Sequence, residues 1–230
     1  MKIVKEICPE IDTPILQKGG LSPEVANYMI ENCIGVMPLP LGLGLGFKVN
    51  GVSYSVPMAI EEPSVIAACS SIAKLIGEKG SGFKCRATPP VMMGQIQILD
   101  IVDYKSAEYQ LKTHKRDIIN YANKSCESMV ARGGGVEDFR VRKLNSSVIV
   151  CELFVNVKDS MGANVINNVV EWTGPYIQDE VLNQGRVGVK ILSNLCTERM
   201  VLSEFTIPIE CMAWKGQSGR HVAEKIVEAQ

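Results

Sequence analysis

The sequence predicts an α+β protein that contains a segment with the element order β-α-β-β-α-β. Three observations support this prediction: alternating apolar residues mark strands, apolar residues at helical spacing mark helices, and glycines or Asn-Gly pairs separate them. The 230 residues are 46% hydrophobic and 21% charged, which is enough apolar material for a core and excludes wholesale disorder. The element order is the split pattern of ferredoxin-like domains, and it occupies residues 95–193.

The part of the chain before this segment predicts two helices with a hairpin between them. The Ser-Pro pair at 22–23 is a typical helix start, with serine as the cap and proline in the first helical position. The Asn-Gly pair at 50–51 predicts a hairpin turn. Pro63 opens the second helix and Gly77 is its predicted stop. The Gly-Leu-Gly-Leu-Gly run at 42–46 leads into the hairpin and not into a helix, so we interpret it as closely packed irregular backbone rather than a dinucleotide fingerprint.

Residues 95–193 and the segment after them complete the prediction. The expected elements are a strand at 95–101, a helix at 106–126, strands at 139–141 and 148–157, a helix at 164–182, strands at 187–191 and 203–209, and a last helix capped by Ser218. The last helix reaches the final residue without a stop signal. We therefore expect the chain to be part of a larger fold.

Composition restricts the partners and the compartment. A net charge of −1 excludes a nucleic-acid binder that relies on bulk basic charge, and we expect the basic stretch 112–116 to be a solvated helix face. Two distant histidines and the absence of a C-x-x-C pair indicate neither a metal site nor a disulfide scaffold. The start of the chain lacks a secretory signal, and the most apolar run, 34–47, is too short for a membrane span. We expect a soluble, cytoplasmic protein whose thiols are free, namely Cys8, Cys33, Cys69, Cys85, Cys126, Cys151, Cys196 and Cys211.

Two adjacent carboxylates, Glu61 and Glu62, come directly before Pro63 at the predicted start of the second helix. As solvated side chains they would be stabilised by the positive end of the helix dipole. As a buried carboxyl, one of them would act as a proton donor. The dipole lowers the pKa of such a group and burial raises it, so both interpretations stay open at this point.

A second candidate site is the segment 158–164, between a predicted buried strand and a long helix. Gly162 lets the backbone approach a ligand closely, and the free N–H groups at a helix start favour a phosphate. The alternative is an ordinary strand-to-helix turn capped by Asp or Asn. Asn194, just past the last predicted strand, is either a polar loop residue or a second contact to the same ligand.

Three segments, taken together, resemble one family. They are residues 30–35, 56–64 and 159–164, with the sequences IENCIG, VPMAIEEPS and DSMGAN. In this order and spacing they are similar to 3-hydroxy-3-methylglutaryl-CoA (HMG-CoA) reductases, and the EEPS form resembles class II, the bacterial and archaeal branch without a membrane anchor. The resemblance runs from about Leu16 to the end of the chain, almost without gaps.

The resemblance implies an oxidoreductase that converts HMG-CoA to mevalonate and CoA, or the reverse, with two nicotinamide cofactors. Glu62 matches the family's catalytic glutamate, which handles the proton on the substrate oxygen. Asn32 and Ser64 lie in segments that line the CoA-substrate side. The cofactor-binding residues that it implies are Asp159, Ser160, Met161, Gly162, Ala163, Asn164 and Asn194.

The resemblance also implies a large helical domain that is interrupted by the ferredoxin-like small domain. Residues 1–94 would begin the large, CoA-substrate domain, residues 95–193 would form the small NAD(P)-binding domain, and residues 194–230 would return to a truncated large domain. The active site would form between two subunits of a homodimer. The expected ligands are HMG-CoA, CoA and mevalonate, with no metal, nucleic acid or membrane.

The chain departs from the family pattern in several places. Ser160 replaces the usual alanine and Cys33 replaces a common β-branched residue, and both changes are mild. The family's catalytic lysine, aspartate and histidine fall beyond residue 230, since Lys215, Lys225 and His221 do not match their motifs. We therefore expect little turnover from this chain alone. The alternatives are a non-catalytic CoA- or nucleotide-binding regulatory subunit of the same fold and an RNA-binding module.

The choice between NAD(H) and NADP(H) depends on a position before the triple glycine. In the NAD-preferring branch an acidic residue there repels a 2′-phosphate. Here the position holds Cys126, with Lys124 and Ser125 beside it, and a one-residue slip would place Glu127 there. The sequence favours NADP(H).

Overall fold

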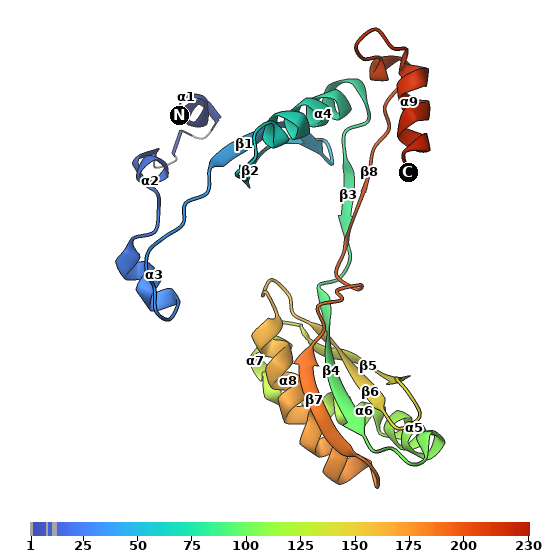
Figure 1. The fold of residues 1–230 in the computed structure, drawn as a ribbon. Coiled ribbons are helices and arrows are strands. Elements are labelled where there is room, and N and C mark those ends of the chain that lie inside the picture. The colour runs from blue at the N-terminus through green and yellow to red at the C-terminus, as the bar shows by residue number, and fades with distance from the viewer. Residues whose placement is uncertain (1, 8, 11–12) are drawn as a thin grey trace. The chain divides into compact units, whose positions relative to one another are not determined.

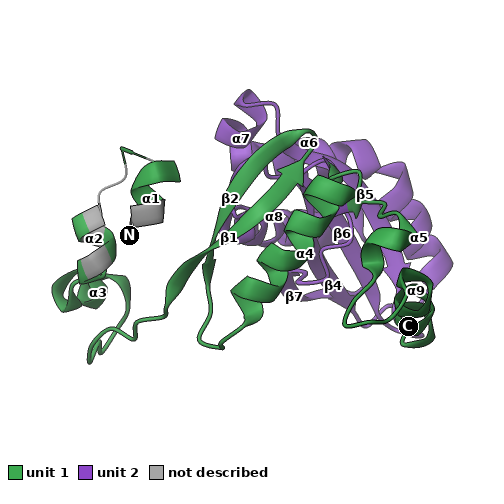
Figure 2. Cartoon of the chain, turned by 90° about the horizontal axis from the view of Figure 1, so that it is seen from above, with its two compact units in different colours: residues 1–85, 203–230 green, residues 86–202 purple. Residues whose placement is uncertain are grey.

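The computed structural model describes residues 2–7, 9–10 and 13–230. The chain forms two compact units, which are described separately: residues 1–85 with 203–230, and residues 86–202 (Figure 2). Both contain helices and strands, so the mixed architecture predicted from the sequence is confirmed. The second unit extends beyond the 95–193 segment on both sides.

The first unit contains helices, a β-hairpin and part of a two-stranded sheet. Its elements are α1 (Lys2–Ile7), α2 (Thr13–Lys18), α3 (Pro23–Met29), β1 (Leu41–Val49), β2 (Val52–Ala59), α4 (Val65–Lys79), the 3₁₀ turn η3 (Ile209–Met212) and α9 (Gly219–Glu228). Strands β3 (Lys84–Ala87) and β8 (Val201–Glu204) pair where the chain passes between the units. The Ser22 and Ser218 hydroxyls cap α3 and α9 as predicted, and β1 and β2 form the predicted hairpin.

The glycine run at 42–46 forms a strand, so the prediction of irregular backbone is wrong. It lies in β1, whose pairing with β2 shifts register between Gly44 and Phe47. The close packing is present: a Cβ on Gly42 would lie 2.6 Å from Ile66 Cδ1, and Gly46 has φ +81° beside the Lys74 backbone. The glycines therefore let α4 pack directly on the hairpin.

Two further expectations for the first unit are corrected. Gly77 does not end α4, which continues to Lys79. A Cβ at Gly77 would lie 3.0 Å from the Gly46 carbonyl, so this glycine serves the approach of β1 and not a helix stop. The strand predicted at 203–209 lies instead at 201–204, where β8 pairs with the four-residue strand β3.

The second unit contains a four-stranded antiparallel sheet in the order β5-β6-β4-β7, with helices against one face (Figure 1). Along the chain its elements are β4 (Val91–Leu99), α5 (Tyr104–Thr113), α6 (Lys115–Asn123), the 3₁₀ turn η1 (Lys124–Cys126), α7 (Glu127–Ala131), β5 (Gly135–Lys143), β6 (Ile149–Asn156), α8 (Ala163–Tyr176), the π-turn η2 (Ile177–Val181) and β7 (Arg186–Leu192). The predicted helix 106–126 is broken at His114, whose φ −91° and ψ 14° leave the helical region.

The core of the second unit lies between the sheet and its helices. Alternate residues of β4, Ile96 and Ile98, are fully buried there, as the period of two requires. Gly94 continues this face, and a Cβ on it would lie 2.5 Å from Val170 Cγ1 and 2.7 Å from Ile166 Cγ2. This glycine therefore lets α8 approach the centre of the sheet.

Two predictions that concern the whole chain can be compared with the described residues. Seven cysteines are free in that part of the chain, and Cys8 lies outside it. Within the same residues no helix is both long enough and apolar enough to cross a membrane.

Candidate functional site

A pocket of about 370 Å³ surrounds the predicted catalytic carboxylate in the first unit. It is formed where β2 ends at Ala59 and the chain turns into α4. Ser64 has φ +72°, outside the helical region, so α4 begins at Val65 and not at Pro63. The pocket is lined by Pro40, Leu41, Gly42, Ile60, Glu61, Glu62, Pro63, Ser64, Ile66 and Ala67.

The structure brings Glu62 and Ser64 together on this pocket. Both side chains are exposed, and the Ser64 hydroxyl does not cap α4. Within the described residues Glu62 takes part in no ion pair. The first unit therefore leaves Glu62 exposed and free to contact a ligand.

The third residue predicted for the substrate side, Asn32, is exposed in the turn after α3, with φ +52°. It is not among the described residues that line the Glu62 pocket. Its left-handed conformation is one that asparagine tolerates well.

The predicted cofactor segment forms a tight turn between β6 and α8 in the second unit. Lys158 and Gly162 have φ of +52° and +98°. The Ser160 hydroxyl and N–H both donate to the Val157 carbonyl, at 2.8 and 3.1 Å. Gly162 is the N-cap of α8, and no described side chain caps the helix. The first N–H groups of α8 are therefore available to an anion, as the sequence predicted for a phosphate.

Three glycine- and asparagine-bearing loops lie at the same end of the sheet. Asn156, the last residue of β6, pairs with Gly135 at the start of β5 and with Val91 at the start of β4. Leu192, at the end of β7, pairs with Gly94. The antiparallel register therefore places the turn 158–164, the glycine turn before β5 and the loop of Asn194 at one edge (Figure 1).

One side-chain contact lies between two of these loops, and another joins α8 to the end of β7. A Cβ on Gly133 would lie 3.6 Å from Lys158 Nζ, so the triple-glycine turn passes beside the cofactor segment. The Asn167 side chain on α8 accepts the Leu192 N–H at 3.0 Å, just before Asn194. Asp159, Met161, Asn164 and Asn194 are exposed at this edge, whereas Gly162 is buried.

The sequence interpretation missed Arg199, which lies in the same loop as Asn194. Its Nη1 donates to the Ser160 carbonyl at 3.2 Å and lies 3.5 Å from Met92 Sδ. The only signal in the sequence was a basic residue in a loop after the last strand.

The residues expected to select the cofactor lie in and around η1. Cys126 is buried, and this burial raises the pKa of its thiol. Lys124 and Ser125 instead line a hollow of about 510 Å³ with three residues of α8, namely Asn168, Glu171 and Trp172. This hollow therefore carries the Lys124 ammonium, the Ser125 hydroxyl and the Glu171 carboxylate, which pairs with Lys190 Nζ at 2.7 Å, whereas Cys126 is not part of its lining.

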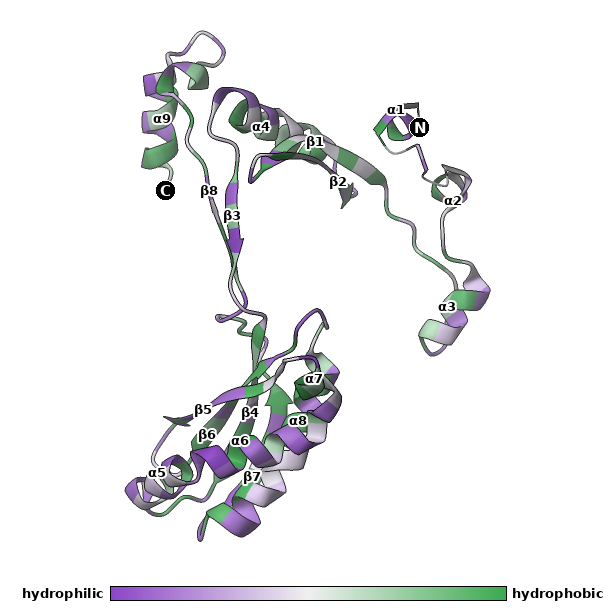
Figure 3. Cartoon of the chain, turned by 180° about the vertical axis from the view of Figure 1, so that it is seen from behind, coloured by the Kyte–Doolittle hydropathy of each residue, from purple (hydrophilic) through white to green (hydrophobic). Residues whose placement is uncertain are grey.

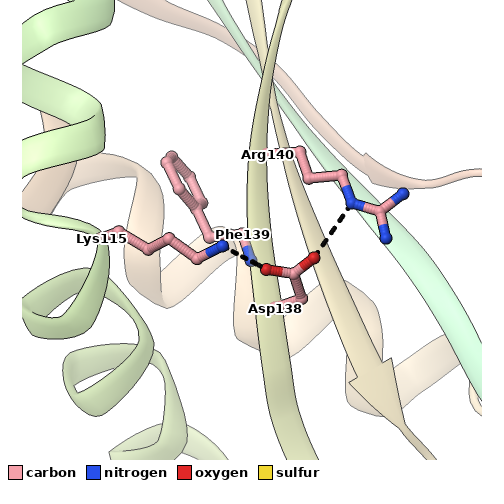
Figure 4. A network of polar contacts seen from close by, with 4 residues as sticks. All are labelled: Lys115, Asp138, Phe139 and Arg140. Carbon is pink, nitrogen blue, oxygen red and sulfur yellow. Dashed lines mark hydrogen bonds and ion pairs between the residues drawn. The ribbon is translucent and has the colours of Figure 1, made fainter.

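An ion-pair network joins the helices to the edge strand β5. Asp138 accepts hydrogen bonds from Lys115 on α6 and from Arg140 Nε, the latter at 3.0 Å (Figure 4). Partial burial acts to raise the pKa of this carboxyl, but the hydrogen bonds from Lys115, Arg140 and the Phe139 N–H outweigh it and lower the pKa. Within the basic face expected at 112–116, Lys115 is partly exposed and pairs with Asp138, which lies at a register shift between Val136 and Asp138 in β5.

Comparison with known proteins identifies the family. The sequence profile described as hydroxymethylglutaryl-coenzyme A reductase matches residues 1–230. The chain belongs to this family. It is 40% identical over 184 residues to 3-hydroxy-3-methylglutaryl-coenzyme A reductase of Archaeoglobus fulgidus, covering 79% of this chain and 42% of that protein. A probable reductase of Borreliella burgdorferi is 28% identical over 200 residues, covering 86% and 44%.

A solved structure shows the same fold. The class II HMG-CoA reductase of Streptococcus pneumoniae, bound to NADPH in open conformations, matches with a TM-score of 0.91 and 30% identity, covering 99% of this chain and 62% of that chain. The chain thus spans less than half the length of the two curated relatives. Glu62 lies in the first unit and the turn 158–164 in the second.

Proposed function

We propose that this chain carries the HMG-CoA-binding and NAD(P)H-binding parts of a class II HMG-CoA reductase. The reaction is the reduction of HMG-CoA to mevalonate and CoA, or its reverse. The observation that carries the proposal is the start of α8, which follows the turn 158–164 and has no side-chain cap. It lies at the end of the sheet that also bears Asn194. The NADPH-bound relative from Streptococcus pneumoniae supports the cofactor class.

The second unit is the proposed cofactor domain. Its element order β-α-β-β-α-β and strand order β5-β6-β4-β7 support a ferredoxin-like assignment. The N–H groups at the start of α8 bind the cofactor's phosphates, and Gly162 keeps the approach free of a side chain. The contacts from side chains come from Asp159, Asn164 and Asn194.

Glu62 is the proposed proton donor and acceptor. Reduction of a thioester to a primary alcohol takes up two hydrides and two protons and releases the thiol, so two nicotinamide cofactors are consumed in one turnover. Glu62 gives a proton to the substrate oxygen as hydride reaches the carbonyl carbon, and Ser64 and Asn32 hold the acyl-CoA. Glu62 is exposed in this unit, and a second subunit of a homodimer is proposed to close the active site over it.

NADP(H) is the proposed cofactor. A 2′-phosphate in the hollow on α8 would meet the Lys124 ammonium and the Ser125 hydroxyl, which favour an anion, while the carboxylate of Glu171 in the same hollow is paired with Lys190. Cys126, at the selecting position, is buried and carries no charge that would repel it. Substituting Lys124→Glu is expected to reverse the preference toward NADH.

Titration of the chain with NADPH and with HMG-CoA tests the two binding sites. A complementation assay then tests whether the chain contributes to catalysis. Mixing the chain with a full-length subunit that carries a substituted catalytic glutamate is expected to restore mevalonate-dependent cofactor reduction, and Glu62→Gln in this chain is expected to abolish that gain. Binding of both ligands without any gain would favour the non-catalytic regulatory subunit. Failure to bind NADPH would reject the cofactor site.

A further inference from the structure

We infer that Arg199 is a positioning residue for the cofactor turn. The role in binding rests on the function proposed above, but the geometry stands on its own. Arg199 is half-buried, and its Nη1 donates to the Ser160 carbonyl at 3.2 Å, across 39 residues of chain. This contact fixes the peptide group between Ser160 and Met161. The orientation of this peptide group decides the direction in which the first N–H groups of α8 point.

The turn has few other restraints beyond its own backbone. The side-chain hydrogen bonds within it are local: Ser160 Oγ donates to the Val157 carbonyl, and the Lys158 N–H donates to Asn156 Oδ1 at 3.2 Å. On the opposite side, Met92 fills the space beside Gly162, where a Cβ would lie 2.7 Å from its Sδ. Arg199 contacts both Ser160 and Met92, so one guanidinium joins the turn to the first strand of the sheet.

The loop that carries Arg199 is itself held in place, which a positioning role requires. Thr88 forms hydrogen bonds with the residues on both sides of Arg199. The Thr88 hydroxyl donates to the Glu198 carbonyl at 2.6 Å and accepts the Met200 N–H at 2.7 Å, and the Thr88 N–H donates to the Met200 carbonyl at 2.9 Å. Thr88 lies between β3 and β4, and Met92 lies within β4, so the guanidinium is placed by contacts at the start of this strand.

The charge of Arg199 fits this role. A cation near the start of a helix interacts unfavourably with the helix dipole, so the dipole does not explain why an arginine lies here. A hydrogen bond from a charged donor to a carbonyl is stronger than one from a neutral donor. The same cation raises the attraction of the turn for a phosphate.

Hydrogen exchange of the ligand-free chain tests the positioning role directly. In Arg199→Ala, the hydrogen-bonded amides of Lys158, Ser160 and Ile166 are expected to exchange about tenfold faster than in the unsubstituted chain, while β5 is unchanged. Arg199→Lys is expected to restore most of the protection, because an ammonium can still donate to the Ser160 carbonyl. Thr88→Val, which leaves the guanidinium but releases its loop, is expected to give a smaller increase. Equal exchange in Arg199→Ala and the unsubstituted chain would overturn the inference.

NADPH binding gives the second readout. Arg199→Ala is expected to raise the Kd about tenfold, with Arg199→Lys within about threefold of the unsubstituted chain. The matched control is Arg186→Ala, which removes an equal charge from an exposed ion pair at the start of β7 and is expected to leave the Kd unchanged. If the unsubstituted chain does not bind NADPH, the proposed function fails and the exchange result still decides the inference. If it binds and Arg199→Ala binds equally well, the inference alone fails.

Discussion

The two units of the chain bury apolar residues to very different extents. In the second unit a continuous core joins the sheet and its helices, and β6 is buried along its whole length. In the described part of the first unit the buried hydrophobic residues are Ala26, Ala73 and Ile76. The first unit instead exposes large apolar side chains, among them Tyr28, Ile34, Met37, Ile72 and Trp214. Figure 3 shows hydrophobic residues on α4 and α9 as well as in the sheet of the second unit.

This difference shows where the stability of the chain resides. Burial of apolar area is the dominant favourable term in folding, so the second unit has the means to be stable on its own residues. The first unit gains little in this way and keeps its hairpin and α4 together through close glycine contacts. The proposed cofactor site therefore stands on a rigid unit, while the proposed substrate pocket stands on a weakly packed one.

The largest expected effect is a cavity in the second core. Ile96→Ala is expected to cost about 2–5 kcal/mol of unfolding free energy, whereas Ile72→Ala in the first unit, at an exposed position, is expected to cost less than about 0.5 kcal/mol. Urea unfolding monitored by tryptophan fluorescence measures each unit separately when one of the two tryptophans is replaced. In a Trp214→Phe background Trp172 reports on the second unit, and in a Trp172→Phe background Trp214 reports on the first. Similar costs for the two substitutions would break the comparison.

A smaller effect is expected at the cofactor turn. Gly162→Ala forces a side chain at φ +98° and places its Cβ 2.7 Å from Met92 Sδ, so we expect a loss of about 1–3 kcal/mol and weaker NADPH binding. Gly19→Ala in the first unit, at φ +76° with none of the described residues within 4 Å, is the matched control and is expected to cost about 1 kcal/mol without altering NADPH binding. Denaturant midpoints and NADPH titration check both, and unchanged binding in Gly162→Ala would argue against the close approach of a ligand.

The Asp138 network is expected to make the second unit sensitive to acid. Because the folded state lowers the pKa of Asp138, its contribution is complete above the unfolded value of about 4 and is lost as the pH falls through the folded pKa. Asp138→Asn is expected to cost about 1 kcal/mol at neutral pH and to weaken the decline of stability below about pH 4. Thermal midpoints of both proteins between neutral and acid pH measure this, and parallel curves would contradict it.

The smallest effect on stability is expected from an exposed ion pair on the surface of the first unit. Lys225→Ala breaks an exposed ion pair with Glu228 on α9, and such pairs contribute about 0–1 kcal/mol. We expect the fluorescence-monitored midpoint of the first unit to move little. A large loss would show that α9 contributes more to the first unit than its exposure indicates.

Local sequence signals determined much of the molecule. The serine caps of α3 and α9, the Asn-Gly turn between β1 and β2, and the β-α-β-β-α-β order all depend on residues within a few positions of one another. The DSMGAN segment was predicted to open a helix for the same reason, and α8 begins at Ala163. The family followed from three short motifs in order.

The tertiary structure decided the features that depend on distant residues. The glycines at 42–46 became a strand because β2 and α4 lie against them, and Gly77 stayed inside α4 because β1 passes beside it. Lys115 reached Asp138 through a bulge in β5, and Arg199 reached Ser160 from 39 residues away. Periodicity and capping depend on near neighbours in the chain, whereas these contacts depend on which elements pack together, so only the folded chain could show them.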